Sequence, residues 1–465
     1  MSHDRGVVPS QVDVVIVGAG ITGLAAAAWC AEHQVRAVLL EKQPEIGGTT
    51  AMSGGWFAFS GTDEQQRRGI VDHDSTFVAD MLAASGGVAD PALLEAYARE
   101  QHDAYDWMRG LGLEFDVVKL SSGQSVPRSH HAPIESVLAA LLARVEAAST
   151  AVLRTGARVV DLIDDGGTVA GVVVELDGGT RRSVHARGVL LGTGGFTRSP
   201  EIIGRYAPRQ VDAMPYGGLG NTGDGLRFAA ARGAALRDME YVSGTFGSHP
   251  ETTIEEHELL TAFYMGAVIV NAEGRRFVDE SASYKTLGAA CLEQPRQIAF
   301  QVFDADVRAQ SQPGVPLSDI DALERKGHVH RADSLRELAE AAGIDAAQLE
   351  RTVHEYNAVV VGDRSDAFGR TGLCNGVGRL VPVTRAPFYA YPAKTLMTST
   401  YCGVAVDAVG RVLTGSGAAV PGLYAAGEVV GGFHGKAYVT GTALSKGLIF
   451  GRLAASHIAL EAAAR

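Results

Sequence analysis

A glycine-rich turn between a short apolar strand and a helix constrains this chain more than any other feature. Residues Asp13–Val17 are almost wholly apolar, which predicts a buried parallel strand. The turn Gly18–Gly23 follows with the pattern GxGxxG, and the alanine-rich stretch Leu24–His33 then predicts a helix. A second apolar run, Ala37–Leu40, ends in Glu41. The segment therefore has the order of a β-α-β unit.

Each part of this unit suits a bound dinucleotide. Gly18 allows the tight turn, Gly20 lets the backbone approach a pyrophosphate, and Gly23 permits close contact between helix and strand. The helix N-terminus stabilises phosphate groups. Glu41 follows at the place where a carboxylate accepts hydrogen bonds from ribose hydroxyls. A turn that serves only packing is the alternative, but strand, helix, second strand and acid together favour a dinucleotide.

Further glycine-rich turns indicate whether the bound dinucleotide is FAD or NAD. Gly47-Gly48-Thr49 and Ser53-Gly54-Gly55 come shortly after the acid, whereas Gly192–Gly195 and Ala426–Glu428 lie far downstream. A nicotinamide site does not need these remote segments. An FAD site does, because the ribityl chain and the isoalloxazine reach across the domain. Each turn alone is also typical of a structural loop, but the set favours FAD.

Composition excludes several classes of partner. The chain has 41 Lys and Arg against 53 Asp and Glu, a net charge of −12, which disfavours nucleic acids and anionic membranes but not an anionic substrate. Its four cysteines, Cys30, Cys291, Cys374 and Cys402, form no CxxC pair, so we expect neither a disulfide framework nor a cysteine-based metal site. The polar start and the lack of a long apolar run predict no export signal, no transmembrane segment and a cytoplasmic location.

The order of elements predicts an α/β fold with a Rossmann-like FAD-binding domain and an inserted second domain of the α+β type. We place the first part of the FAD-binding domain at 1–240, the inserted domain at 241–384 and the second part at 385–465. Short β-like runs with Asp-Gly-Gly turns between 152 and 191 predict an antiparallel excursion that returns to the main sheet. A long helix is expected from about Gly441 to the end.

The chain resembles the flavoprotein superfamily of fumarate reductase, succinate dehydrogenase and 3-ketosteroid dehydrogenase. The matching stretches are Val14–Gly55, Gly188–Phe196, Asn221–Gly225, Gly274–Glu280, Phe303–Arg308 and Gly422–Gly451. The resemblance implies an FAD domain interrupted by a capping domain, with substrate between them. Gly48 stands where members with covalent flavin carry His, so the FAD is expected to be non-covalent. Beyond the residues already named, the resemblance implies cofactor contacts from Ile21, Thr22, Lys42, Thr50, Ala157, Gly194, Gly195, Asn221, Thr222, Asp224, Gly427, Ala443 and Leu444.

Two tyrosines divide the branches of this superfamily. Members like fumarate reductase carry Arg at the positions of Tyr284 and Tyr438, and a carboxylate-binding His at the position of Ser399. The absence of these two arginines and of this histidine argues against succinate or fumarate chemistry. Both tyrosines instead match the 3-ketosteroid dehydrogenase pattern, although the turn Tyr438–Thr442 departs from that family's Tyr-Pro-Gly-Pro-Gly. A third tyrosine expected near the cleft has no clear counterpart.

Desaturation next to a ketone needs an oxyanion site, a base for the α-proton and an acceptor for the β-hydride. We expect Tyr438 and a backbone N–H of Gly441 or Thr442 to form the oxyanion site. Tyr284 is the expected base, and the flavin is the hydride acceptor. A buried tyrosine with a satisfied hydroxyl is the alternative at either position.

Other candidate residues have two interpretations. Arg308 matches the proton donor of fumarate reductases, but a structural ion pair fits equally well. Arg128, His130 and His131 fall in an expected loop near the cleft, where they either bind a substrate carboxylate or are solvated. Tyr401 is an expected substrate contact.

The leading hypothesis is an FAD-dependent enzyme that introduces a C=C bond beside the carbonyl of a cyclic ketone, either a 3-oxosteroid or a monocyclic ketone such as 4-oxocyclohexanecarboxylate. The electron acceptor is open, O₂ or a quinone-type molecule among the choices, and the sequence predicts no oligomeric state. An enoate or fumarate-type reductase that uses Arg308 as the acid is the second hypothesis. A non-enzymatic FAD-binding electron-transfer subunit is the third.

Overall fold

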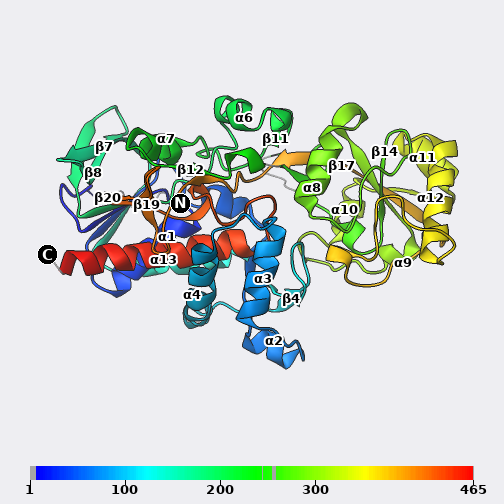
Figure 1. The fold of residues 1–465 in the computed structure, drawn as a ribbon, viewed down its shortest axis with the longest axis horizontal. Helices are drawn as coiled ribbons and strands as arrows, with labels where there is room; N and C mark the ends of the chain where they lie inside the picture. Colours follow the sequence, from blue (N-terminus) through cyan, green and yellow to red (C-terminus); the bar gives the residue numbers. More distant parts are fainter. Residues whose placement is uncertain (1–6, 243, 254–257, 464–465) are drawn as a thin grey trace. The chain divides into compact units, whose positions relative to one another are not determined.

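The computed structural model describes residues 7–242, 244–253 and 258–463 (Figure 1). The contacts within the chain divide it into two compact units. Unit 1 comprises the described residues of Met1–Pro208, Gly217–Val242 and Ser399–Arg465, and unit 2 comprises those of Arg209–Tyr216 and Ser243–Thr398. Unit 2 is therefore an insertion in the sequence of unit 1.

Unit 1 is built on a six-stranded, mostly parallel sheet. Its strands, in the order in which they lie in the sheet, are β19 (Arg411–Leu413), β20 (Ala419–Ala425), β10 (Gly188–Leu191), β1 (Val14–Val17), β2 (Ala37–Leu40) and β6 (Ala151–Arg154). Val14 of β1 lies opposite Ala37 on one side and Gly188 on the other, with both neighbours parallel. All residues of β1, β2 and β10 are buried, as apolar strands covered on both faces must be. The carboxyl end of β1 lies where the strand order reverses, the place where such sheets bind ligands.

Helices α1 (Ile21–Glu32), α5 (Ile134–Glu146) and α13 (Thr442–Ala463) are the main helices packed around this sheet, and α1 contacts both of the others. The approach of α13 to α1 requires glycine. A Cβ on Gly451 would lie 2.4 Å from the Thr22 carbonyl oxygen. This contact places the middle of α13 beside the first turn of α1.

The rest of unit 1 consists of smaller sheets and helices. The predicted antiparallel excursion is present as β7 (Ala157–Asp165), β8 (Thr168–Leu176) and β9 (Arg181–His185). The other strands are β3 (Trp56–Ala58), β4 (Val117–Lys119), β5 (Ser129–His131), β12 (Leu236–Arg237) and β18 (Gly403–Val404). The other helices are α2 (Asp63–Arg67), α3 (Asp74–Ala84), α4 (Pro91–Gly110), α6 (Pro200–Tyr206) and α7 (Asp224–Ala231).

Unit 2 is organised around the long strand β17 (Phe388–Met397). This strand pairs with β11 (Met214–Pro215), β13 (Thr245–Ser248), β15 (Ala299–Phe303) and β16 (His330–Ala332), and β14 (Val268–Asn271) pairs with β15. The helices are α8 (Tyr284–Leu292), α9 (Ala305–Arg308), α10 (Ile320–Arg325), α11 (Leu335–Ala342) and α12 (Ala346–Val360). The sequence places the end of the inserted domain at 384, whereas unit 2 continues through Thr398, because β17 completes this sheet rather than the sheet of unit 1.

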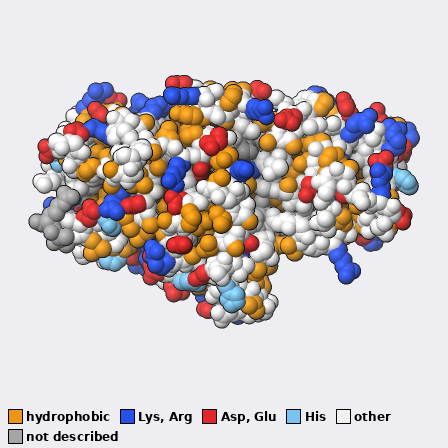
Figure 2. All heavy atoms as spheres, in the orientation of Figure 1, with side chains coloured by type: hydrophobic (Ala, Val, Ile, Leu, Met, Phe, Trp, Pro, Cys, Tyr) orange, Lys and Arg blue, Asp and Glu red, His pale blue; other side chains and the backbone are white. Residues whose placement is uncertain are grey.

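The surface carries charges of both signs. On the face shown in Figure 2, acidic and basic side chains are interspersed. No helix among the described residues combines the length and the apolar character that crossing a membrane requires.

Candidate active site

The glycine-rich turn after β1 has no room for side chains at its first and last glycines. Gly18 has φ +100°, and a Cβ on it would lie 2.5 Å from the Gly192 carbonyl oxygen. A Cβ on Gly23 would lie 1.8 Å from the Gly18 carbonyl oxygen. Helix α1 begins after Gly20, which has no side chain with which to cap it. The positive end of α1 is therefore suited to a phosphate.

The end of β2 supplies the predicted carboxylate. Glu41 is buried, and its two oxygens accept the N–H groups of Ala19 and Gln43, each at 2.8 Å. A carboxylate oxygen accepts more than one hydrogen bond, so this geometry retains capacity for ribose hydroxyls. The Ala157 N–H donates to the Glu41 carbonyl at 2.8 Å, which places another predicted cofactor residue at this end of the site.

Predicted cofactor residues that are remote in sequence meet at Glu428. The Glu428 carboxylate accepts the Asn221 side-chain amide at 2.9 Å and the Thr400 N–H at 2.9 Å. Asn221 also donates to Thr49 Oγ1 at 3.2 Å. A Cβ on Gly195 would lie 2.4 Å from a Glu428 oxygen. The first glycine loop after Glu41 and the turns at 195, 221 and 428 therefore form one continuous cradle.

Two more contacts connect this cradle to the glycine-rich turn. A Cβ on Gly427 would lie 2.2 Å from Thr22 Oγ1 on α1. Lys42, directly after Glu41, donates to Thr222 Oγ1 and to an Asp224 oxygen, both at 2.7 Å. An elongated dinucleotide that runs from Glu41 along α1 toward Glu428 fits this arrangement. NAD would not need the turns that meet at Glu428.

The remaining predicted cofactor residues differ in their surroundings. Thr50 Oγ1 accepts the Ile21 N–H at 3.0 Å and so fixes the first glycine loop after Glu41 against α1. A Cβ on Gly48 would meet nothing within 4 Å, whereas one on Gly55 would lie 2.1 Å from the Ala132 carbonyl oxygen. Gly194, Ser53, Gly54, Ala443 and Leu444 lie in the same loops and in the first turn of α13.

Three rings gather before the N-terminus of α13. Tyr401 and Tyr438 stack with centroids 4.7 Å apart and an angle of 18° between their planes. His434 meets both rings edge-on, at 5.0 Å from Tyr401 and 5.6 Å from Tyr438. His434 Nε2 lies 3.1 Å from Thr442 Oγ1, so the cluster is joined to the first residue of the helix.

Tyr401 is held in an unfavourable backbone conformation. Its φ of +56° lies in the left-handed region, which costs a residue with a side chain of order 1–3 kcal/mol. Burial raises the pKa of Tyr401, and the neighbouring Tyr438 and Glu428 raise it further. The Tyr401 hydroxyl therefore stays protonated at neutral pH and can donate a hydrogen bond.

The two predicted backbone donors of the oxyanion site are not equivalent. The Thr442 N–H donates to the Val439 carbonyl at 3.1 Å, which corrects the expectation that Thr442 serves a substrate with this group. Gly441 has φ +95°, and a Cβ on it would lie 2.7 Å from the Ala58 nitrogen. Gly441 remains the backbone candidate.

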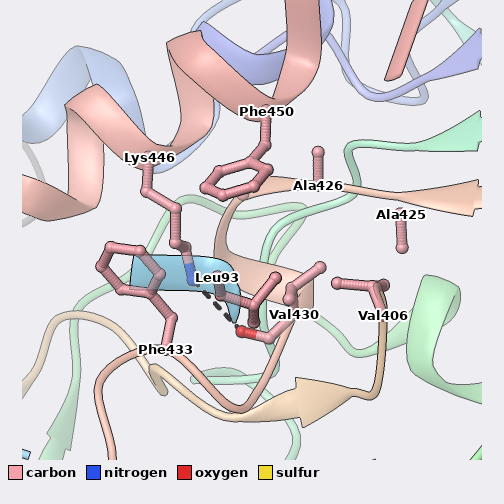
Figure 3. A pocket seen from close by; sticks show the side chains of 9 residues that line it. Leu93, Val406, Ala425, Ala426, Val430, Phe433, Lys446 and Phe450 are labelled. Atoms are coloured by element: carbon pink, nitrogen blue, oxygen red, sulfur yellow. Dashed lines mark hydrogen bonds between the residues drawn. The ribbon is translucent and has the colours of Figure 1, made fainter. Parts of the chain in front are cut away.

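A buried lysine lies on the following turn of α13. Lys446 is 2% exposed, donates to the Val430 carbonyl at 3.1 Å and lies 5.4 Å from the centre of the Phe433 ring (Figure 3). A mostly apolar cavity of about 10 Å³ adjoins it, room for one water at most. Burial lowers the pKa of Lys446 to about 8, against the opposite effect of Glu428 and Asp238.

Lys446→Met is expected to stabilise the protein at pH 7 by about 1–3 kcal/mol, because the buried ammonium is then gone. Since its folded pKa of about 8 lies below the ordinary 10.5, the unfolded chain binds more protons between these values, and the free energy of unfolding of the parent rises with pH across this window. Denaturant titrations at pH 7 and pH 10 should show the difference between variant and parent shrinking. The exposed Lys436→Met serves as the control. If the free energies of unfolding of variant and parent differ by the same amount at both pH values, the titration of Lys446 is not the cause of that difference.

Unit 2 carries the two predicted catalytic residues that precede β17. Tyr284 is 5% exposed and is the first residue of α8. Arg308, the last residue of α9, binds Asp321 at 2.5 Å and Glu324 at 2.8 Å on α10. Burial acts to lower the pKa of Arg308, but these hydrogen bonds raise it above the ordinary value. The structural ion pair is therefore the favoured interpretation of Arg308.

The structure corrects the expected loop at 128–131. Arg128 is fully buried, donates twice to Asp72 at 2.6 and 2.7 Å and also binds Asp80, so its guanidinium is not available to a substrate. His130 lies on β5, fully buried, and burial lowers its pKa to about 4. It is neither a solvated nor a charged residue. His131 is half-buried beside Trp56, and its pKa is also lowered by burial.

The comparison with known proteins decides the family. The family model described as an FAD binding domain matches residues 13–444. The chain belongs to the fumarate reductase/succinate dehydrogenase flavoprotein family. It is therefore an FAD-dependent oxidoreductase, and the prediction of FAD as the cofactor is confirmed. The glycine cradle, the α1 N-terminus and Glu41 fit that cofactor.

The relatives in this family are similar over nearly the whole chain. Fumarate reductase (cytochrome) of Shewanella frigidimarina is 32% identical over 455 residues, which are 96% of this chain and 77% of that protein. Urocanate reductase of Eggerthella lenta is 28% identical, over 97% of this chain and 75% of that protein.

Two solved structures confirm the α/β fold class with its FAD-binding domain. The open conformation of a flavocytochrome c3 fumarate reductase matches with a TM-score of 0.79 and 28% identity, over 97% of this chain and 79% of that one. A 3-ketosteroid Δ1-dehydrogenase from Sterolibacterium denitrificans also matches with a TM-score of 0.79, at 23% identity over 97% of this chain and all of that one. The second likeness concerns the fold alone.

Sequence reasoning missed three features of unit 1. The sequence does indicate the burial of Lys446, because it is the one charged residue in a run of apolar and small residues from Thr442 to Phe450. It does not indicate the contact of Thr400 with Glu428 or the stacking of Tyr401 on Tyr438, since they join segments that are distant in sequence.

Proposed function

We propose that this protein introduces a C=C bond α,β to the carbonyl of a cyclic ketone. The observation that carries the proposal is the stacked pair of Tyr438 and Tyr401 before the N-terminus of α13, at the end of the cradle marked by Glu428. Neutral donors at the start of a helix suit an oxygen whose negative charge grows during the reaction. A carboxylate substrate would instead call for an arginine.

The roles of the chain's own groups follow from this assignment. Tyr438 donates a hydrogen bond to the ketone oxygen, and Gly441 contributes a backbone N–H. Tyr401 packs on Tyr438 and, since its hydroxyl is protonated, supports it as a donor. Tyr284, acting as its phenolate, takes the α-proton and becomes a neutral phenol. Bound FAD supplies the acceptor for the β-hydride. The substrate loses one proton and one hydride, and an external electron acceptor restores the oxidised flavin.

The two tyrosines also favour desaturation of a ketone over reduction of an unsaturated acid. The relatives are named fumarate and urocanate reductases, so reduction of an unsaturated acid is the second candidate. That candidate requires Arg308 to donate a proton, and Arg308 is held by two carboxylates. By the resemblance to fumarate reductases, Tyr284 and Tyr438 stand where those enzymes carry the arginines that bind a dicarboxylate. Non-covalent FAD, with Gly48 at the attachment position, stays a prediction.

Anaerobic titration of the FAD-loaded protein tests this proposal. Cyclic ketones, both 3-oxosteroids and 4-oxocyclohexanecarboxylate, should bleach the flavin absorbance within the time of mixing. Dithionite-reduced protein should regain that absorbance slowly with fumarate or urocanate. If no ketone bleaches the flavin and an unsaturated acid restores it rapidly, the reductase is the correct assignment. The same experiment with steroid and monocyclic ketones side by side identifies the substrate size.

A further inference from the structure

Two histidines from distant segments meet beside β17 in unit 2. Strand β13 ends with Ser248 opposite Lys394, and β16 begins with His330 opposite Ala390. The residue after β13, His249, and a residue just before β16, His328, therefore reach the same short stretch of β17. Their rings are parallel, with centroids 3.9 Å apart, and His249 also packs against the Tyr391 ring at 5.6 Å.

Carboxylates complete this cluster. Glu251 has an oxygen 3.7 Å from His328 Nε2, and its side chain is 77% exposed. Glu258, which is buried, binds His328 Nδ1 and also Lys326. One nitrogen each of His249 and His328 and one oxygen of Glu251 all lie within 4.8 Å of one another.

We propose that His249, His328 and Glu251 bind a divalent transition-metal ion of the Zn²⁺ type, with Glu258 orienting His328. Two imidazoles and one carboxylate are a donor set that suits Zn²⁺, and Mg²⁺ and Ca²⁺ prefer oxygen alone. Metal-bound histidines commonly donate their other ring N–H to a carboxylate, which is the arrangement of His328 with Glu258.

The charges around the site are consistent with a cation. With neutral imidazoles, Glu251 and Glu258 outweigh Lys326 by one negative charge. Tetrahedral Zn²⁺ with bonds of about 2.1 Å holds its ligand atoms about 3.4 Å apart. The group must therefore contract. Because a metal ion lies in the plane of each imidazole that binds it, the parallel rings of His249 and His328 must also turn out of their stack, and the exposed Glu251 side chain must rotate inward. The buried hydroxyls of Ser248 and Thr252 flank the site and have no hydrogen-bond partner among the described residues.

Isothermal titration of the chelator-treated, FAD-loaded protein with ZnCl₂ tests this site. The parent should bind one Zn²⁺ per chain, and excess Mg²⁺ should not compete. His249→Ala and His328→Ala should each weaken binding by about 100-fold or more, and Glu258→Gln by about 10–100-fold. Glu251→Gln, which alters an exposed side chain, should also lose most of the affinity while leaving the fold intact.

His354→Ala is the matched control, because this histidine is exposed on α12 of the same unit. It should bind Zn²⁺ like the parent. FAD content and circular dichroism establish that each variant is folded. Failure of the parent to bind one equivalent, or equal binding by the parent, Glu251→Gln and His249→Ala, would overturn the proposal.

Discussion

Replacing Tyr284 with phenylalanine is expected to lower kcat for ketone desaturation by about 10²–10⁴-fold, the contribution that a general base typically makes. The substitution removes only a hydroxyl, so FAD content and ketone binding should stay close to those of the parent. Tyr284 is 5% exposed and begins α8, after the Ser283 cap that accepts the Lys285 N–H at 3.3 Å. The partial positive charge at a helix start stabilises a phenolate. Stopped-flow measurement of anaerobic flavin reduction gives the rate directly.

The control for Tyr284 is another buried tyrosine of the same unit. Tyr356 on α12 donates its hydroxyl to the Val381 carbonyl at 3.0 Å and packs in the core of unit 2. Tyr356→Phe should cost about 0.5–1.5 kcal/mol of stability and leave the rate of flavin reduction unchanged. If Tyr284→Phe behaves like Tyr356→Phe, with a rate within a few-fold of the parent, Tyr284 does not act as the base. The half-buried His131 would then be the next residue to test.

The cofactor half of the site follows from local sequence. Gly18, Gly20, Gly23 and Glu41 all act within one β-α-β unit, where residue spacing determines which groups lie at the turn. The remote turns were predictable only as a set, since no spacing rule says that Asn221 reaches Glu428. Their convergence depends on the whole sheet of unit 1.

The incorrect expectations have a common physical cause, which is that a side chain's partners come from other segments. Arg128 follows a loop-like stretch and was expected near substrate, but Asp72 and Asp80 enclose it. The apolar run at 388–393 predicts a strand correctly, yet apolar character does not say which sheet it joins. The meeting of His249 and His328 depends on two strands aligned along β17, which neither segment shows by itself.

The substitution Tyr438→Phe should separate the two enzymatic candidates and lower kcat by about 10²–10³-fold, or about 3–4 kcal/mol, with little change in KM. The stacking of ring 438 on Tyr401 and its edge contact with His434 are kept, so the loss reports the hydroxyl alone. That hydroxyl gains strength as a donor when the ketone oxygen becomes enolate-like, because α13 begins at Thr442 and adds its positive end. The effect therefore falls on the transition state more than on the bound ketone.

Phenols that imitate the enolate provide a second measurement, independent of turnover. They should bind the FAD-loaded parent with a charge-transfer band and lose most of their affinity in Tyr438→Phe. Tyr424→Phe is the matched control, since Tyr424 is a buried tyrosine of unit 1 whose hydroxyl donates to Glu461 at 3.1 Å, near the other end of α13. A variant Tyr438→Arg that reduces fumarate rapidly would support this position as the branch point between a neutral donor for ketones and a charge for dicarboxylates. Full ketone-dependent flavin reduction by Tyr438→Phe would instead remove Tyr438 from the oxyanion site and leave Tyr401, with its protonated hydroxyl, as the donor to be tested.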